Sequence, residues 1–378
     1  MGQHDVSRHS SSDGRTIYRL PLEVFPKFWG NAYLVVGGRR PILVDTGSGQ
    51  ASSNRCLSEA FEQVRARFGE SIGFRDLGAI VLTHGHIDHF GGLGYLAERT
   101  SAPVHIHVLD RRVVAGYRER VAMASRHVDN FFAAAGVDDA KRPRYMATYQ
   151  RTKALFSSGR IDETFEEGAI VGGELEALHV PGHCPGQVCL RLGDVLLTAD
   201  HVLADITPHL SPEVITRHTG MAHYFDSLAR VAELEGVALA LGGHHGPIED
   251  LSARLEVIRQ HHRERLTRVL ELSSEPASIV ELSRHLPVAF SSAGSGPSPP
   301  RSIPPSSMCA PRLSRLESTM LITDRICVRS SPRMSIELFI RRPSFSSTVV
   351  FSRFRVIAKI SVPASGPVPS PPEVLNRT

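Results

Sequence analysis

Histidines and aspartates are densely grouped between residues 83 and 89, where the sequence reads Thr-His-Gly-His-Ile-Asp-His. The group directly follows the apolar run Ala79–Leu82, which predicts a buried strand ending at Thr83. Side chains that leave a strand end into a loop can converge on one point, and the spacing of His84 and His86 places two imidazoles on the same side. Neutral imidazole and carboxylate are ligands that zinc prefers, so this segment predicts a metal site.

Further residues of ligand type stand at similar places in the chain. His183, Asp200 and the pair His244-His245 each come directly after an apolar run that predicts a strand. Layered α/β proteins place their sites at the carboxyl ends of strands, so these side chains are expected to converge with the first group. Together they provide enough donors for two ions.

In this order the residues resemble the metallo-β-lactamase superfamily, whose pattern is His-x-His-x-Asp-His followed by a lone His, a lone Asp and a last His. The resemblance covers about residues 18–270 and includes the turn Asp45-Thr46-Gly47. It implies an α/β fold, the four-layer αβ/βα metallo-β-lactamase sandwich, here with a truncated or altered C-terminal helical segment. The metals would lie at one edge of the sheets.

The resemblance also implies the ligands of two zinc ions. His84, His86 and His183 would hold the first ion, Asp88, His89 and the last His the second, and Asp200 would bridge them. Many relatives read Gly-His-Gly-Pro at the last ligand, which aligns with the His245-Gly246-Pro247 of this chain and favours His245 over His244. Cys184 stands where relatives commonly carry threonine or serine, and a buried, unreactive cysteine is favoured there over a metal-binding thiolate.

Two zinc ions that flank one water lower its pKa to near neutrality and so supply a hydroxide at working pH. The predicted function is a zinc-dependent hydrolase that uses this metal-bridged hydroxide on a thioester, ester or lactone of a small acyl substrate. Asp88 would be both a ligand and the catalytic residue that orients the hydroxide. A mildly acidic main domain and a helical insert at residues 111–160 favour a substrate of the hydroxyacylglutathione hydrolase type.

Three other functions are weighed against this one. An endoribonuclease or phosphodiesterase of the β-lactamase-like group shares the Gly-His-Gly-Pro ending, so nucleic acid is an alternative substrate that is not favoured. A mononuclear iron sulfur dioxygenase is disfavoured because ligands for two ions are all present. A non-catalytic metal-binding module is disfavoured because no ligand of the pattern is lost.

Several residues near the pattern have more than one interpretation. Asp45 either accepts a hydrogen bond from a ligand imidazole or forms an Asx turn. Phe25, Phe28 and Trp29 form either an apolar rim near the site or part of the core. His209 either overhangs the site or is a solvated loop residue. The other histidines are interpreted as packing or surface residues: His105, His107, His201, His261 and His262.

The character of the chain divides it into three parts. Residues 1–250 alternate strands and helices and form the predicted catalytic domain, and 251–288 are a helical segment that resembles the start of a small winged-helix-like domain. Residues 289–378 contain 13 of the 25 prolines, 19 serines and no histidine. Such a composition predicts either a disordered tail or translation outside the ancestral frame.

Charge and cysteine content constrain the setting. The net charge of +4 divides into +8 after residue 288 and −4 before it, so the excess of positive charge is no argument for nucleic-acid binding. Five cysteines without a CxxC pair favour a reducing, cytoplasmic location. No run of eighteen apolar residues occurs, so no membrane partner is expected. The oligomeric state is left open.

Overall fold

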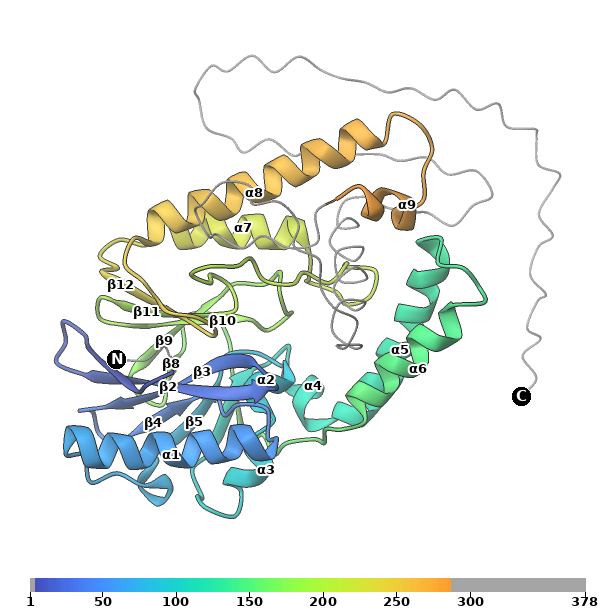
Figure 1. Cartoon of the computed structure of the whole chain (residues 1–378). Helices are drawn as coiled ribbons and strands as arrows, with labels where there is room; N and C mark the ends of the chain where they lie inside the picture. Colours follow the sequence, from blue (N-terminus) through green and yellow to red (C-terminus); the bar gives the residue numbers. More distant parts are fainter. Residues whose placement is uncertain (1–3, 287–378) are drawn as a thin grey trace, which may run out of the picture. The chain divides into compact units, whose positions relative to one another are not determined.

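A computed structural model describes residues 4–286 of the chain, so the predicted tail at 289–378 lies outside the described residues. Two sheets form the centre of the fold, one of seven strands and one of six. Figure 1 shows α1 and α3 beside the first sheet and α7 and α8 beside the second, with the two sheets between them. This arrangement confirms the predicted four-layer αβ/βα sandwich.

The first sheet has the strand order β1 to β7 along the chain. Strands β1 to β4 pair antiparallel, and β4 to β7 pair parallel. The carboxyl ends of β4, β5 and β6 therefore meet at one edge. The strands are β1 (Ser7–Ser10), β2 (Thr16–Phe25), β3 (Phe28–Val36), β4 (Ile42–Val44), β5 (Ala79–Leu82), β6 (Val104–His107) and β7 (Glu163–Phe165).

The second sheet has the order β13-β12-β11-β10-β9-β8. Here β11 and β12 are parallel neighbours, so their carboxyl ends also meet at one edge. The strands are β8 (Ile170–Val171), β9 (Leu175–His179), β10 (Val188–Leu192), β11 (Val195–Ala199), β12 (Leu239–Gly242) and β13 (Pro247–Ile248).

The helices follow the apolar spacing of the sequence. In α1, Leu57, Phe61 and Val64 are buried against the first sheet. Asp250 caps the N-terminus of α8, because its side chain accepts the backbone N–H of Ala253 at 2.8 Å. The remaining helices include a short 3-10 turn, Phe74–Asp76. The helices are α1 (Ala51–Phe68), α2 (Ile87–Phe90), α3 (Leu93–Leu96), α4 (Arg111–Ala115), α5 (Tyr117–Ala134), α6 (Arg142–Lys153), α7 (Met221–Ala232), α8 (Leu251–Leu272) and α9 (Ile279–Arg284).

Three apolar layers separate the four layers of structure. Strand β3 shows how they arise, because Ala32, Leu34 and Val36 face α1 while Tyr33 and Val35 face the other sheet. Such alternation is expected of a strand that is buried on both faces. A third cluster joins the second sheet to α7 and α8.

The predicted insert at 111–160 is helical, and α5 and α6 lie side by side as a projecting hairpin in Figure 1. The predicted helical segment at 251–288 contains a second, short helix, α9. It begins with a capping box between Ser278 and Glu281, and the backbone N–H of Val280 donates to the oxygen of Ala135 at 3.0 Å. Within residues 4–286 no helix has both the length and the apolar surface that crossing a membrane requires.

Candidate metal centre

The predicted ligands come from four segments that leave strand ends. The segment after β5 carries two histidines and then enters α2, which carries Asp88 and His89. The loop between β9 and β10 carries His183, Asp200 directly follows β11, and the segment after β12 carries His244. The structure brings these side chains into three adjoining groups whose ligand atoms lie within 4.8 Å: His84, His86, His183 and Cys184; His84, His89 and Asp200; Asp88, His89 and His244.

The carboxylate of Asp200 connects these groups. Its Oδ2 atom lies 3.6 Å from Nε2 of His183 and 3.4 Å from Nε2 of His244, and its Oδ1 atom lies 3.4 Å from Nε2 of His89. Good hydrogen bonds are shorter, about 2.7 to 3.2 Å. Two ligand atoms about 2.0 Å from one tetrahedral zinc are about 3.3 Å apart, so these separations suit donors that share an ion.

The other nitrogen of each ring already has a partner. Nδ1 of His89 donates to Asp45 at 2.8 Å, Nδ1 of His183 to the backbone oxygen of His209 at 2.6 Å, and Nδ1 of His244 to the backbone oxygen of Trp29 at 2.7 Å. These bonds fix the tautomers and aim each Nε2 atom into the cluster.

Three of the Nε2 atoms, those of His84, His89 and His183, are buried and have no hydrogen-bond partner within residues 4–286. The Oδ1 atom of Asp200 is likewise buried and has no hydrogen-bond partner within the same residues. Buried polar atoms without a partner are rare because each costs stability, and a cation on these atoms would satisfy all of them. The residues present therefore fit a metal centre.

The sequence favoured His245 as the last histidine of the pattern, but the structure places His244 there instead. His244 lies in the cluster, with Nε2 3.5 Å from Asp88 Oδ2, whereas the His245 ring lies outside it and pairs with Asp205 at 3.2 Å. The physical reason is the backbone. His245 has a φ of 65°, in the left-handed region, and this turn directs its side chain away from the site. The backbone oxygen of His245 accepts hydrogen bonds from Asn31 at 3.0 Å and Arg19 at 3.1 Å.

Asp45 accepts hydrogen bonds from the site rather than forming only an Asx turn. Besides His89, its carboxylate accepts the backbone N–H of Thr83 at 2.9 Å and the Thr83 hydroxyl at 2.8 Å. Because that hydroxyl donates to Asp45, it accepts from Nδ1 of His84 at 3.0 Å. One buried carboxylate thus orients two predicted ligands.

Sequence reasoning missed Asp110, which is fully buried beside the site. Its Oδ2 accepts the backbone N–H of Gly85 at 2.7 Å, and its Oδ1 accepts that of Gly186 at 2.9 Å. Burial raises the pKa of this carboxyl to about 6, although the two backbone donors act in the opposite direction. Asp110 joins the two ligand loops to each other. Asp110 stands three residues after the end of β6, at the edge of the sheet where the other strand ends gather.

Close packing at Gly243 shows how tightly the segments meet. A Cβ atom on this glycine would overlap Asp200 Oδ1 and would lie 2.8 Å from Cε1 of His89. Only glycine leaves room for β12 to approach the carboxylate that connects the groups.

The surroundings of the site histidines shift their pKa values in ways that favour binding of cations. Burial and the neighbouring histidines lower the pKa of His84 and His86, which keeps these imidazoles in the neutral form that metals bind. Burial would lower the pKa of His89 as well, but Asp200, Asp45 and Asp88 outweigh it and raise that pKa. A bound cation would take over this role of balancing the buried carboxylates.

The remaining histidines lie outside the metal groups, as predicted. His105 pairs with Glu163 at 3.3 Å, the His107 ring stacks on His179 at 4.1 Å, and His201 packs against Tyr224 at 5.2 Å. The backbone oxygen of His209 accepts the hydrogen bond from His183, so its loop lies beside the site, which was one of the two interpretations of the sequence. Phe28 was one of three aromatic residues interpreted either as a rim near the site or as core. Its side chain is partly exposed, and its ring centre lies 4.8 Å from that of His244.

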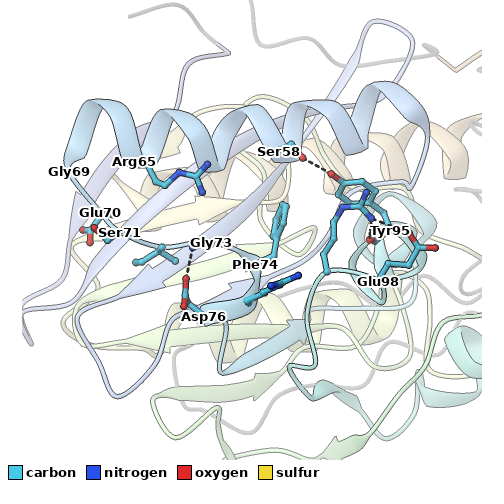
Figure 2. Close-up of a pocket in the computed structure, with 13 residues that line it drawn as sticks. Ser58, Arg65, Gly69, Glu70, Ser71, Gly73, Phe74, Asp76, Tyr95 and Glu98 are labelled. Carbon is cyan, nitrogen blue, oxygen red and sulfur yellow. Dashed lines mark hydrogen bonds and ion pairs between the residues drawn. The ribbon is translucent and has the colours of Figure 1, made fainter.

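A separate surface hollow lies between α1, the segment 69–76 and α3 (Figure 2). Its lining mixes charges of both signs, among them Arg65, Glu70 and Arg99, and the Arg99 guanidinium lies 3.7 Å from the Tyr95 ring centre. None of the predicted ligands lines this hollow, so it is not the site of the metal chemistry.

Comparisons with known proteins agree with this geometry. Residues 28–259 match the sequence model of the metallo-beta-lactamase superfamily. Probable metallo-hydrolase YflN of Bacillus subtilis is 28% identical over 235 residues, which are 59% of this chain and 81% of YflN. The atrochrysone carboxyl ACP thioesterase of Aspergillus fumigatus is 24% identical over 62% of this chain and 57% of that enzyme. The chain spans less than two thirds of the fungal relatives that it matches.

Among solved structures, a metallo-beta-lactamase family protein from Thermus thermophilus superposes with a TM-score of 0.60 at 29% identity, covering 71% of this chain and 86% of the other. The family match extends over more than half of the chain and includes all the ligands identified above. The protein belongs to the metallo-beta-lactamase superfamily.

Proposed function

We propose that this protein is a zinc-dependent hydrolase that binds two metal ions and cleaves a thioester, ester or lactone of a small acyl substrate. One observation carries the proposal: imidazoles and carboxylates from four segments converge, and three buried Nε2 atoms among them lack a hydrogen-bond partner within residues 4–286. The cytoplasmic location and the domain boundaries at residues 250 and 288 remain predictions from the sequence.

The residues divide between two positions. His84, His86 and His183 would hold one ion, Asp88, His89 and His244 the other, and Asp200 touches both sets. Zinc bound at these positions would lower the pKa of a bound water, and its positive charge would stabilise the oxygen that becomes negative in the transition state. Asp88 keeps 15% of its side chain exposed, so its carboxylate can also accept a hydrogen bond from the attacking water and orient it.

The surroundings favour an acyl substrate with an anionic part. The exposed Phe28 ring beside His244 offers an apolar contact. Lys153, at the end of α6, interacts electrostatically with Asp88 and Cys184, and burial lowers its pKa. A cation so close to the site suits a carboxylate or phosphate group of the substrate. The fungal relative named as an acyl-carrier-protein thioesterase agrees with thioester cleavage.

The proposal is tested by loading the purified full chain with zinc and screening acyl thioesters, esters, lactones and phosphodiesters. We expect hydrolysis of acyl substrates, lost in Asp200→Asn and kept in His245→Ala, which alters the neighbouring histidine outside the cluster. Cleavage of phosphodiesters alone would assign the chain to the nuclease-like members. Two bound ions without any hydrolysis would favour a binding module.

A further inference from the structure

The thiol of Cys184 lies among the donors of the first metal position. Its side chain is buried, and Sγ is 3.3 Å from Nε2 of His86. Cys184, His84, His86 and His183 each offer one atom to a group that spans no more than 4.8 Å. We propose that Cys184 is a protein ligand of the first ion, in addition to the three imidazoles and the shared carboxylate of Asp200.

The distance suits two donors of one ion. Zinc–nitrogen and zinc–sulfur bonds of about 2.05 and 2.3 Å at a tetrahedral angle place the two donor atoms about 3.6 Å apart. The 3.3 Å between Cys184 Sγ and His86 Nε2 is close to this value. A thiol is only a weak hydrogen-bond donor, so a direct bond to the imidazole would contribute little.

A second observation shows that the group is open to a cation. His84 and His183 are buried, and their Nε2 atoms have no hydrogen-bond partner within the described part of the chain. These atoms belong to the same group as the thiol. Because all four atoms lie within 4.8 Å of one another, one ion placed between them would be near the sulfur as well.

The backbones of the loops that carry His86 and Cys184 are tied together. Asp110 accepts the N–H groups of both Gly85 and Gly186, one from each ligand loop. The N–H of Val188 donates to the oxygen of Thr83 at 3.0 Å and ties the same two segments together. These bonds fix the backbones of the two loops that carry His86 and Cys184 relative to each other.

This inference rests on the proposed metal centre and adds a property to it. When the sulfur–metal bond forms, the thiol proton leaves to solvent. Sulfur ligands favour zinc, cobalt and other borderline or soft ions over magnesium and manganese. With the thiolate added to the three imidazoles and the shared Asp200, the first ion would have its positions filled by protein donors, so the attacking water would be activated on the side of Asp88, His89 and His244.

Cobalt(II) provides the test, because a thiolate bound to cobalt gives an intense near-ultraviolet charge-transfer band that imidazole and carboxylate do not give. The full chain is stripped of metal and titrated with cobalt alone. We expect the band in the wild type and in Cys56→Ser, which changes a half-buried cysteine of α1. In Cys184→Ser the band should vanish while cobalt still binds.

Zinc-edge X-ray absorption on the wild type gives an independent measurement if Cys184→Ser does not fold. One sulfur neighbour at about 2.3 Å supports the proposal, since Cys184 is the one cysteine of residues 4–286 in the ligand groups. Cobalt or zinc bound with only nitrogen and oxygen neighbours overturns the inference and leaves the proposed function intact. A chain that binds neither metal overturns both.

Discussion

The backbone oxygen of Trp29 accepts a hydrogen bond from Nδ1 of His244 at 2.7 Å, across the interface between the two sheets. This contact turns the opposite ring nitrogen of His244 toward Asp88 and Asp200, at 3.5 and 3.4 Å. The neighbouring His245 makes no such contact and pairs with Asp205 near the surface. Two adjacent histidines of the same sequence motif thus have different surroundings.

His244→Ala should therefore impair the protein far more than His245→Ala. Loss of a ligand should empty the second metal position and slow hydrolysis by at least about tenfold, which is the scale seen even for groups that only orient ligands. His245→Ala should keep both ions. Elemental analysis and turnover of the two variants decide the matter, and the opposite ranking would restore His245 as the ligand.

Much of this fold and site follows from patterns in the sequence. The bounds of β5 agree with the predicted strand at 79–82, because that run is strongly apolar and ends at a polar residue. The predicted helical segment at 251–288 contains α8, which begins at Leu251, and the shorter α9. The convergence of His84, His183 and Asp200 follows from the rule that strand ends gather.

Two features of the site were beyond local patterns. The choice between His244 and His245 depends on a left-handed backbone at residue 245, which motif spacing does not report. The role of Asp110 depends on Gly85 and Gly186, whose N–H groups reach it only after both ligand loops are placed. Both the choice of His244 and the role of Asp110 therefore depend on contacts between segments that are distant in the sequence.

Asp45→Asn should weaken binding at the second metal position. The carboxylate accepts the Nδ1 proton of His89, and an amide offers only one acceptor oxygen where the aspartate has two acceptor oxygens in use. A loss of about ten- to a hundredfold in zinc affinity is expected. Competition with a chromophoric chelator measures it. Asp205→Asn, outside the cluster, is the control and should bind zinc normally. Equal affinities in the two variants would show that Asp45 does not orient the ligand.

Asp110→Asn should loosen the connection between the ligand loops. The amide can accept the N–H of only one of Gly85 and Gly186, so one backbone donor stays buried without a partner, at a cost of about 1 to 3 kcal/mol. Denaturant unfolding of the metal-free protein measures this loss. Asp139→Asn, on an exposed residue paired with Arg142, is the comparison. Unchanged stability in Asp110→Asn would argue against the connecting role.

His262 should make the fold sensitive to acid. It is buried in α8 against Tyr224 and Phe225, and burial, with a further effect of His261, lowers its pKa from 6.5 to about 3. Below pH 6.5 the unfolded chain takes up a proton that the folded chain does not. The free energy of unfolding therefore falls as pH drops from about 6.5 toward 3, by about 1.4 kcal/mol per pH unit for this group.

His262→Leu should make the free energy of unfolding less dependent on pH, because this group no longer takes up a proton on unfolding. Unfolding measured between pH 7 and 5 tests this. His285→Leu is the matched control, because His285 is exposed in the folded protein. Equal slopes in the wild type and His262→Leu would mean that His262 is protonated inside the fold.

The metal content of the purified full chain decides whether the converging side chains hold two ions. We expect close to two zinc ions per chain, loss of hydrolysis when a chelator removes them, and recovery when zinc is returned. One ion or fewer in the chain saturated with zinc, or a single iron with almost no zinc in the protein as isolated, would contradict a two-zinc hydrolase.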